Sequence, residues 1–164
     1  MPKIHLGVVD VPYVQRLSLT ERRRYMWLMK RRPWQSLGAT VSTGDVASFI
    51  ENRYALMETF ATMHHDDIAG VLETRMQGAL ENAMMGKPAS DADVYGDLSP
   101  VEEMFRRALD EREFDGVIAG VPTGASLAGV NHRLRRPHAR GNAVRSSFVD
   151  TGMFRQSFKA WLEK

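Results

Sequence analysis

The first residues of the chain alternate between apolar side chains and others. Ile4, Leu6 and Val8 are separated by single residues, which is the period of a strand with one buried face. Pro12 ends the pattern, because proline lacks the backbone N–H that a strand ladder uses. The sequence therefore predicts one strand over about residues 3–9.

A helical pattern follows. Ser18 and Glu21 have the spacing of a capping box, in which the serine oxygen accepts a hydrogen bond from a first-turn amide and the glutamate reaches back to the cap. Pro33 cannot continue a helix. We expect a short arginine-rich helix over about residues 19–32 and a loop over residues 34–41.

The strongest helical stripe begins after Thr43 or Asp45, either of which can cap a helix. Apolar residues then recur at three- and four-residue spacing, which is typical of one face of a helix: Val46, Phe49, Ile50, Met57, Phe60 and Ala61. We expect this face to be buried, and Phe49, Met57 and Phe60 in particular. A second apolar run follows residues 64–67 and ends at Gly86-Lys87-Pro88. The range 44–84 is predicted to form one long helix with a kink, or two helices.

A further helix is predicted to start near Pro100, with Ser99 as its cap and Glu102 as its N3 residue. It should stop before Gly116, and its buried face should comprise Val101, Met104, Phe105, Ala108 and Leu109. Glycines then recur and regular structure should be sparse up to about Arg145. The last residues predict a short helical turn and then a strand from about Ser157.

These elements predict an α+β fold, in which a small sheet is flanked by amphipathic helices and a long irregular basic loop precedes the C-terminal segment. A length of 164 residues fits a single domain, residues 1–164. Its parts would be an N-terminal strand and basic helix (1–42), a helical core (43–115), a Gly/Arg-rich loop (116–147), and a C-terminal turn and strand (148–164).

Composition removes several classes of protein. Hydrophobic residues make up 43% and charged residues 26% of the chain, which is typical of globular proteins. No apolar run approaches the roughly 20 residues of a membrane-spanning helix, and the first residues lack the apolar stretch of a signal peptide. We therefore expect no membrane contact and folding in the cytoplasm. The absence of cysteine excludes disulfides, thiol nucleophiles and cysteine-based metal sites.

Charge is distributed unevenly along the chain. Residues 44–104 hold twelve acids and three bases, a net charge of 3 − 12 = −9. Residues 16–32 hold seven bases and one acid. Residues 116–149 hold no acid and five arginines, namely Arg133, Arg135, Arg136, Arg140 and Arg145. Such asymmetry indicates either a polyanionic partner or a subunit whose basic face meets the acidic face of its neighbour.

The residues that could support catalysis or metal binding have simpler explanations. His64-His65-Asp66-Asp67 cannot converge on one ion, because neighbouring helical residues point about 100° apart, so we interpret it as a solvated polar junction. Ser126 lies in a glycine-rich turn without the strand, histidine and acid that a serine nucleophile needs. Lys87 is followed by proline rather than Ser or Thr, unlike a phosphate-binding loop. Glu102 and Glu103 lie in a first helical turn, where acids favour the helix dipole.

We therefore predict no catalytic residue, no metal, no cofactor and no small-molecule substrate. The five arginines leave three alternatives: a subunit interface, contact with nucleic-acid phosphates, or a solvated loop. No helix-turn-helix, RNP-like or zinc-finger pattern accompanies them. The aromatic residues near the C-terminus belong either to the core or to an exposed apolar edge at which subunits associate; they are Phe148, Phe154, Phe158 and Trp161.

The C-terminal segment resembles a known family. In residues 148–158 an acidic-Thr-Gly triplet, Asp150-Thr151-Gly152, is followed by an apolar residue and then by Ser157, and Arg135-Arg136-Pro137 precedes the triplet. This segment is similar to the C-terminal signature of neck and tail-completion proteins of tailed bacteriophages. The order of parts, from an N-terminal strand through long amphipathic helices and an irregular loop to the Thr-Gly segment, is similar too. The predicted helix that ends near Arg32 is not part of that family pattern.

The resemblance implies a non-enzymatic structural subunit of the virion, made in the host cytoplasm, that forms a ring of typically six copies. Such rings join head to tail as a connector, collar or gateway, or terminate the tail tube. Their partners would be copies of the chain itself, other neck, portal or tail proteins, and packaged DNA. The arginines named above would face an interface or DNA, and the assembly segment would comprise Phe148, Asp150, Thr151, Gly152, Phe154, Phe158 and Trp161. The alternative is a nucleic-acid-binding module without sequence specificity, or a regulatory one, that uses the basic loop.

Overall fold

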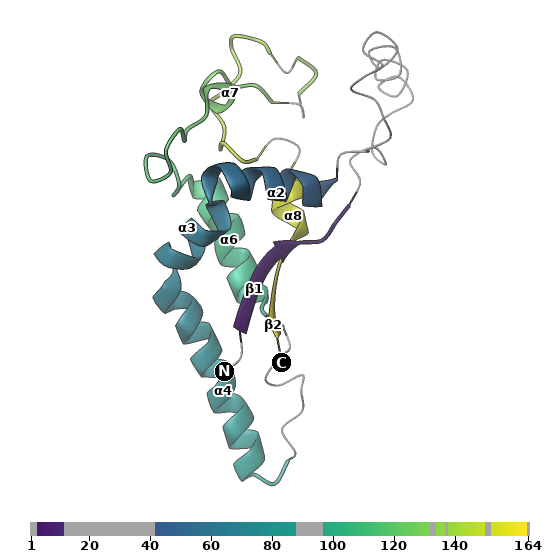
Figure 1. The fold of residues 1–164 in the computed structure, drawn as a ribbon, viewed down its shortest axis with the longest axis vertical. Coiled ribbons are helices and arrows are strands. Elements are labelled where there is room, and N and C mark those ends of the chain that lie inside the picture. Colours follow the sequence, from purple (N-terminus) through teal and green to yellow (C-terminus); the bar gives the residue numbers. More distant parts are fainter. Residues whose placement is uncertain are drawn as a thin grey trace.

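A computed structural model describes residues 3–11, 42–87, 97–131, 134–136, 138–149 and 152–163. Within them the chain order is β1 (Lys3–Val8), α2 (Thr43–Tyr54), α3 (Leu56–Met63), α4 (His65–Met84), α6 (Ser99–Glu111), α7 (Gly124–Leu127), α8 (Met153–Ser157) and β2 (Phe158–Glu163) (Figure 1). The prediction of an α+β fold with a small sheet and several helices is confirmed. The helix predicted over residues 19–32 lies outside the described residues.

The sheet joins the two ends of the chain. β1 and β2 pair antiparallel from Lys3 opposite Glu163 to Val8 opposite Phe158. Ile4, Leu6 and Val8 therefore share one face with Phe158, Ala160 and Leu162, and this face packs on the core. Both predicted strands are confirmed, as is the helical turn before β2.

The start of α2 differs from the prediction. Ser42 is the N-cap: its hydroxyl accepts from the Asp45 N–H (3.2 Å), and the Asp45 carboxylate accepts in return from the Ser42 N–H (3.0 Å). Thr43 is instead buried, where its hydroxyl donates to the Val9 carbonyl (2.6 Å) and accepts from the Val11 N–H (2.8 Å). These two hydrogen bonds of Thr43 fix the start of α2 to the residues that follow β1.

The helix predicted to begin after Thr43 and to include Phe60 and Ala61 breaks at Ala55, which has a left-handed conformation (φ 46°, ψ 46°). Across the break the Glu51 carboxylate accepts from the N–H groups of Met57 (2.8 Å) and Glu58 (3.2 Å), two first-turn amides without helical partners. The resulting turn buries Phe60 completely and leaves Met57 half-buried. Phe49 is 64% exposed, so its predicted burial is wrong. The prediction treated the residues before and after Ala55 as one uninterrupted helix with a single buried face.

α6 also begins differently. Its N-cap is Leu98, and Ser99 is the first helical residue. The carboxylate of Asp97 accepts hydrogen bonds from the Ser99 hydroxyl and from the Ser99 N–H (2.9 Å), and these bonds lower the pKa of Asp97. The predicted end before Gly116 is confirmed, since α6 ends at Glu111 and Arg112 takes the left-handed C-cap conformation.

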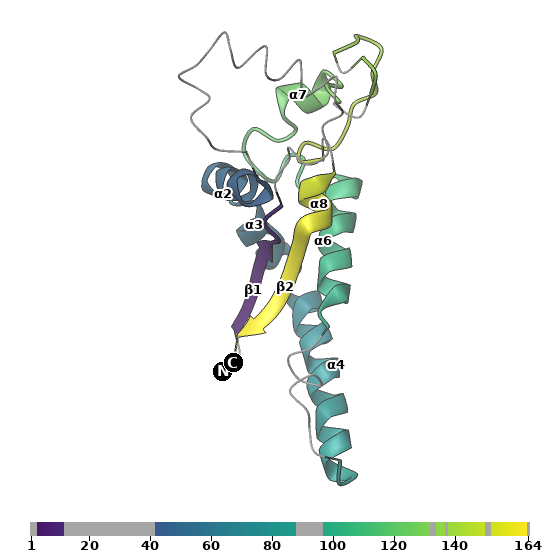
Figure 2. The same ribbon diagram turned by 90° about the vertical axis from the view of Figure 1, so that its right-hand side faces the viewer.

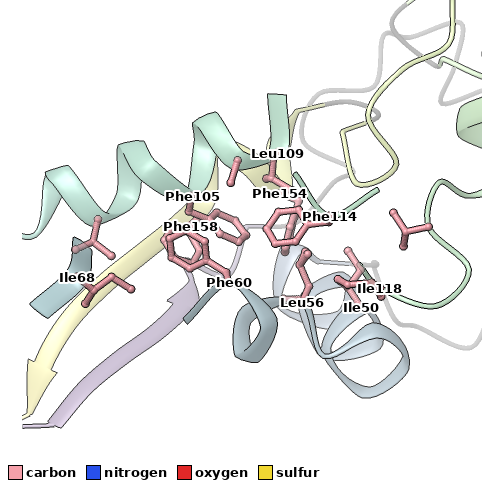
Figure 3. Packing of buried hydrophobic residues seen from close by; sticks show 14 residues of the cluster. Ile50, Leu56, Phe60, Ile68, Phe105, Leu109, Phe114, Ile118, Phe154 and Phe158 are labelled. Carbon is pink, nitrogen blue, oxygen red and sulfur yellow. The ribbon is translucent and has the colours of Figure 1, made fainter. Parts of the chain in front are cut away.

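The core lies between α3, α6, α8 and the inner face of the sheet (Figure 3). Its centre is aromatic: Phe105 stacks on Phe158 with ring centroids 3.9 Å apart, and Phe60 meets Phe105 edge-on at 5.0 Å. Of the predicted α6 face, Met104 is half-buried and the other four residues are fully buried: Val101, Phe105, Ala108 and Leu109.

α4 projects from this core. Figures 1 and 2 show its C-terminal half extending past the sheet and α6, while α7 and the loop residues around it lie at the opposite end of the molecule. Ile68 and Ala79 are the two α4 residues that are fully buried, over a helix of 20 residues. α4 and α7 therefore mark opposite ends of the molecule.

Candidate assembly surfaces

A stripe of apolar side chains is exposed on α4. Met76, Leu80 and Met84 are four residues apart and are 59%, 62% and 80% exposed. Positions four apart differ by only about 40° around a helix, so these side chains form one continuous stripe. Leu80 follows the buried Ala79 and therefore points about 100° away from the buried side of the helix. We call Met76, Leu80 and Met84 the α4 stripe.

Acidic residues accompany this stripe. Glu73 and Glu81 are exposed, three residues before Met76 and one residue after Leu80. Asp66 and Asp67 are exposed in the first turn, where negative charge suits the positive end of the helix dipole. Arg75 is the one base of the helix, and it is half-buried. α4 thus presents apolar and acidic side chains to solvent.

The loop after α6 is held by Arg145. Its backbone N–H donates to the Ser126 carbonyl (3.3 Å), and the Ser126 hydroxyl donates back to the Arg145 carbonyl. The Arg145 guanidinium donates to the carbonyl oxygens of Val130, Ser146 (2.8 Å) and Val149 (3.0 Å). These hydrogen bonds hold the Arg145 guanidinium within the subunit. They correct the prediction that Arg145 faces an interface or DNA.

Ser126 is part of the same support. It lies in α7, whose N-cap is Thr123, and it is completely buried. The expected glycine-rich turn is therefore a short capped helix. Gly129, just after it, has φ 66°, and a Cβ there would lie 2.5 Å from the Asn142 carbonyl oxygen. The loop is closely packed at this point, and residues 129 and 142 approach each other because glycine has no side chain.

Three of the predicted arginines are exposed. Arg135, Arg136 and Arg140 lie on the surface of the loop, whereas Arg133 lies outside the described residues. The backbone beside them is ordered by the Asn142 side chain, which donates to the Arg136 carbonyl (3.0 Å). These three side chains are therefore available to a partner, in contrast to Arg145.

The C-terminal segment divides between core and surface. Gly152 is the N-cap of α8 and has φ 81°, a conformation that glycine adopts without strain. Asp150 and Thr151 lie outside the described residues. Phe154 and Phe158 are 3% and 0% exposed, so they belong to the core and are not available to a neighbouring subunit. This corrects the expectation that they form an assembly surface.

Phe148 and Trp161 behave differently from those two phenylalanines. Phe148 is half-buried and meets the Tyr54 ring edge-on at 5.4 Å. Trp161 is 47% exposed on the outer face of the sheet, where it stacks on His5 (centroids 5.7 Å apart). Of the aromatic residues in the predicted assembly segment, Trp161 presents the most surface to a partner.

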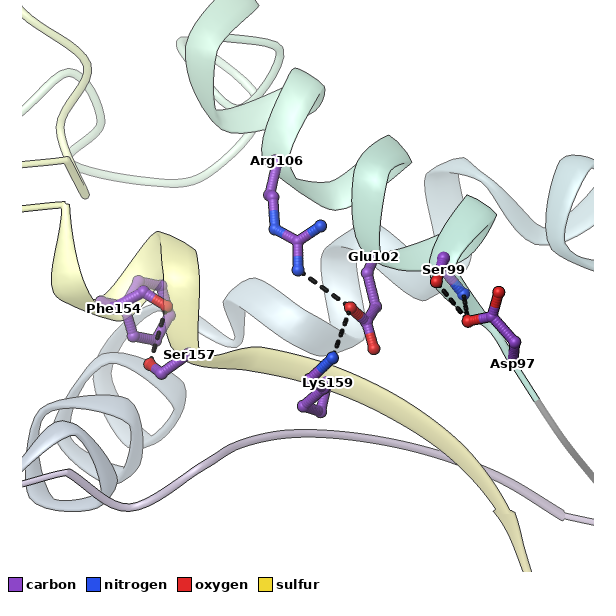
Figure 4. Close-up of polar contacts among 7 residues, drawn as sticks. All are labelled: Asp97, Ser99, Glu102, Arg106, Phe154, Ser157 and Lys159. Atoms are coloured by element: carbon purple, nitrogen blue, oxygen red, sulfur yellow. Dashed lines mark hydrogen bonds and ion pairs between the residues drawn. The ribbon is translucent and has the colours of Figure 1, made fainter.

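Glu102 forms a buried polar centre that is not among the predicted site residues (Figure 4). It is 5% exposed, and its Oε2 accepts from Arg106 Nη2 (2.9 Å) on α6 and from Lys159 Nζ (3.0 Å) on β2. Burial raises the pKa of Glu102, but these hydrogen bonds, the Lys159 charge and the Ala160 N–H outweigh it, so the pKa lies below its ordinary value. Glu102 and Arg106 are four residues apart on α6, and this spacing is the sequence feature from which their ion pair could have been predicted.

The polar junction between α3 and α4 is also more enclosed than expected. His64 Nε2 lies 2.8 Å from Glu113 Oε2, and the imidazole ring contacts the Phe60 ring at a centroid distance of 4.9 Å. His65 and Asp66 do face solvent. Among the described residues no group of three or more potential metal ligands converges on one point. His64 therefore connects the junction of α3 and α4 to the turn that follows α6.

A comparison of the chain with protein-family models, curated proteins and solved structures finds no match. In the described part of the chain no helix is both long and apolar enough to cross a membrane.

Proposed function

We propose that this chain is a structural subunit of the neck or tail-completion region of a tailed bacteriophage, where it forms a ring that joins head to tail or terminates the tail tube. The observation that carries the proposal is the α4 stripe. Met76, Leu80 and Met84 are each more than half exposed on a helix that projects from the core. Large apolar side chains gathered in this way are typical of a surface that another protein covers.

The arrangement of charge supports a ring rather than a two-fold dimer. The C-terminal half of the acidic helix α4 and the loop after α7, which carries the exposed arginines, lie at opposite ends of the molecule (Figures 1 and 2). Contact between unlike ends of two copies is heterologous, and a heterologous contact that closes on itself generates a ring. Attraction between carboxylates and arginines of neighbouring copies would also guide assembly.

The C-terminal segment provides the second support. Its Asp-Thr-Gly triplet precedes α8, and Gly152 has the positive φ that explains why glycine is suited to this position. The segment leads from the basic loop directly into the core through Phe154 and Phe158. A partner that binds the loop would therefore act on residues that are connected to the core, as expected for an assembly contact.

A phage complementation assay tests the proposal. The variant Arg135→Glu/Arg136→Glu should reduce the number of intact tailed particles strongly, because it reverses two exposed charges of the proposed contact. Arg107→Glu, which reverses an exposed arginine on α6, is the matched control and should leave particle numbers close to wild type. Normal particle numbers from the loop variant would overturn the proposed role.

The exposure of Arg135, Arg136 and Arg140 favours one second candidate, a nucleic-acid-binding module. Phosphate contacts made by such arginines carry no sequence information and weaken as salt rises. Binding of the free protein to double-stranded DNA should then fall steeply between about 50 mM and 200 mM salt. Retained particle assembly together with lost DNA binding in the Arg135→Glu/Arg136→Glu variant would favour this candidate.

A further inference from the structure

A second exposed row of side chains runs along α4 beside the α4 stripe. Glu73, Gln77 and Glu81 are exposed and four residues apart, and the Gln77 amide donates to the Glu73 carboxylate (3.4 Å). Each of the three lies three residues before a member of the α4 stripe, so the two rows are about 60° apart around the helix and adjacent to each other. α4 thus presents an apolar row beside an acidic row. A partner fits both rows if it carries apolar side chains next to cations.

A second copy of α4 does not meet this requirement. The helix contains no lysine and one arginine, Arg75, which is half-buried. Two α4 helices in contact would therefore bring apolar rows together without offering cations to Glu73 and Glu81. The loop of the same subunit is out of reach, because the C-terminal half of α4 and α7 lie at opposite ends of the molecule (Figures 1 and 2).

The loop of a neighbouring copy has the required composition. Leu127, Leu134 and Val144 are 55%, 45% and 43% exposed. The three exposed arginines lie between Leu134 and Val144 in sequence, and residues 116–149 contain no acid. We call the following residues the loop surface: Leu127, Leu134, Arg135, Arg136, Arg140 and Val144.

Hydrogen bonds hold the segments that carry the loop surface together. The Arg145 N–H donates to the Ser126 carbonyl (3.3 Å), which joins the segment of Val144 to that of Leu127. The Asn142 side chain donates to the Arg136 carbonyl (3.0 Å). The loop surface is therefore fixed by contacts within the subunit, and less conformational entropy is lost when a preorganised surface binds.

Several cations elsewhere on the described surface are matched by acids of the same subunit. Arg107 on α6 lies four residues from Glu103 and from Glu111, both exposed. Lys159 Nζ lies 3.0 Å from Glu102 Oε2. The arginines of the loop surface have no acid near them in sequence, so they suit an acidic partner better.

We infer that the apolar and acidic rows of α4 bind the loop surface of a neighbouring copy, with its apolar side chains against the α4 stripe and its arginines beside Glu73 and Glu81. This inference rests on the proposed function, because it names the contact between subunits of the ring. The contact joins unlike surfaces of two copies, so it is heterologous and repeats from one copy to the next.

Two charge-reversal variants test the pairing. Glu73→Arg/Glu81→Arg places cations on α4, and Arg135→Glu/Arg136→Glu places acids on the loop surface. Each variant alone should self-associate about tenfold or more weakly than the wild type in sedimentation, because like charges meet at the contact. An equimolar mixture should recover association, since α4 of each variant then meets the complementary loop of the other. Failure of the mixture to recover would overturn the inference.

Two further substitutions separate pairing from a general effect of charge. Glu103→Arg, at an exposed position of α6, should leave association unchanged. Lys87 is exposed three residues beyond the end of α4. Lys87→Glu should strengthen association about twofold or more, because it removes a cation that repels the neighbouring arginines. Weaker association of Lys87→Glu would contradict the pairing.

Cross-linking locates the contact and identifies the occupant. The chain has no cysteine, so Leu80→Cys in one copy and Leu134→Cys in an isotope-labelled copy provide the only thiols. A short bismaleimide should join labelled to unlabelled chains through these residues. Phe49→Cys, at an apolar position of α2 that is 64% exposed, is the control and should not join to Leu80→Cys. Preferential joining of Leu80→Cys to itself would identify a second α4 as the occupant and overturn the inference.

The two proposals fail separately. If the wild type self-associates but the mixture does not recover and the 80–134 product does not form, the inference is wrong and the ring is built on another contact. If the wild type is monomeric at every concentration, the inference is also wrong, while phage complementation with Arg135→Glu/Arg136→Glu still tests the virion role. Confirmed pairing together with normal particle numbers in that assay would overturn the virion role alone.

Discussion

Single residues of this protein differ sharply in what they contribute, even when they are of the same type and near each other in sequence. Phe49 and Phe60 were expected on one buried stripe, yet the first is 64% exposed and the second is fully buried. Glu102 and Glu103 are adjacent, yet the first is buried in an ionic network and the second is exposed. In each pair, substitution of the buried residue is a test of the fold and the same substitution of the exposed residue is its control.

Phe60→Ala should lower the free energy of unfolding by roughly 3–5 kcal/mol, because the ring leaves a cavity beside Phe105 and Phe158. Phe49→Ala is the control and should change stability by about 0.5 kcal/mol or less, as is usual at the surface. Urea denaturation followed by circular dichroism measures both. Equal losses in the two variants would contradict the described core.

Glu102→Gln should lower stability by about 2 kcal/mol at neutral pH, because the ionised carboxylate accepts hydrogen bonds from Arg106 and Lys159. The pKa of Glu102 is lower in the folded state than its ordinary value of 4.5. The stabilisation is therefore complete above that value and is lost as the pH falls through the folded pKa. Urea denaturation between about pH 7 and pH 3 should show the wild type losing its advantage over Glu102→Gln on acidification.

The exposed neighbour supplies the control for this pH experiment. Glu103→Gln should leave the acid dependence of unfolding close to that of the wild type. A pH-independent difference between wild type and Glu102→Gln would show that the carboxylate charge is not what Arg106 and Lys159 stabilise.

At the level of elements, the breaks between helices determine which residues reach the core. The range 43–84 forms three helices because Ala55 and His64 interrupt it. Each interruption has a side-chain partner: Glu51, near in sequence, binds the first amides of α3, and Glu113, distant in sequence, contacts His64. The Ala55 break costs energy, since a residue with a Cβ is disfavoured in the left-handed region.

Ala55→Gly should therefore stabilise the protein by about 0.5–1 kcal/mol, because relief of the left-handed strain exceeds the entropy that glycine adds to the unfolded chain. Ala61→Gly, inside α3, should instead destabilise it by about 1 kcal/mol. Thermal unfolding of the two variants checks the opposite signs. A loss of stability in Ala55→Gly would contradict the break.

The whole molecule is asymmetric, with an aromatic core in the middle, a projecting apolar and acidic helix at one end and an arginine loop at the other. In the free subunit, amide hydrogens of residues 76–84 should exchange faster than those of residues 101–109, because the first segment has few buried contacts and the second is part of the core. Assembly should slow exchange in residues 76–84 specifically. Unchanged exchange there on assembly would show that the stripe is not a subunit contact.

Much of the fold was predictable from local patterns. Alternation at residues 4–8 and the apolar spacing of α6 depend only on the periods of strand and helix, which the chain repeats clearly. The break at Ala55 was not predictable in this way, because alanine favours helices and the interruption depends on Glu51 reaching the next helix. The sequence does not single out Ser42 as the cap, because Thr43 and Asp45 are also residue types that cap helices.

By itself the sequence determined the fold class, the approximate helices, the absence of cysteine chemistry, and the opposed charges of the acidic centre and the arginine loop, because these follow from composition and from contacts between residues near in sequence. Only the tertiary structure decided which side chains are free to act. It places Phe154, Phe158, Arg145 and Glu102 inside the subunit and leaves the α4 stripe outside. Burial depends on which distant segments meet, and no local pattern contains that information.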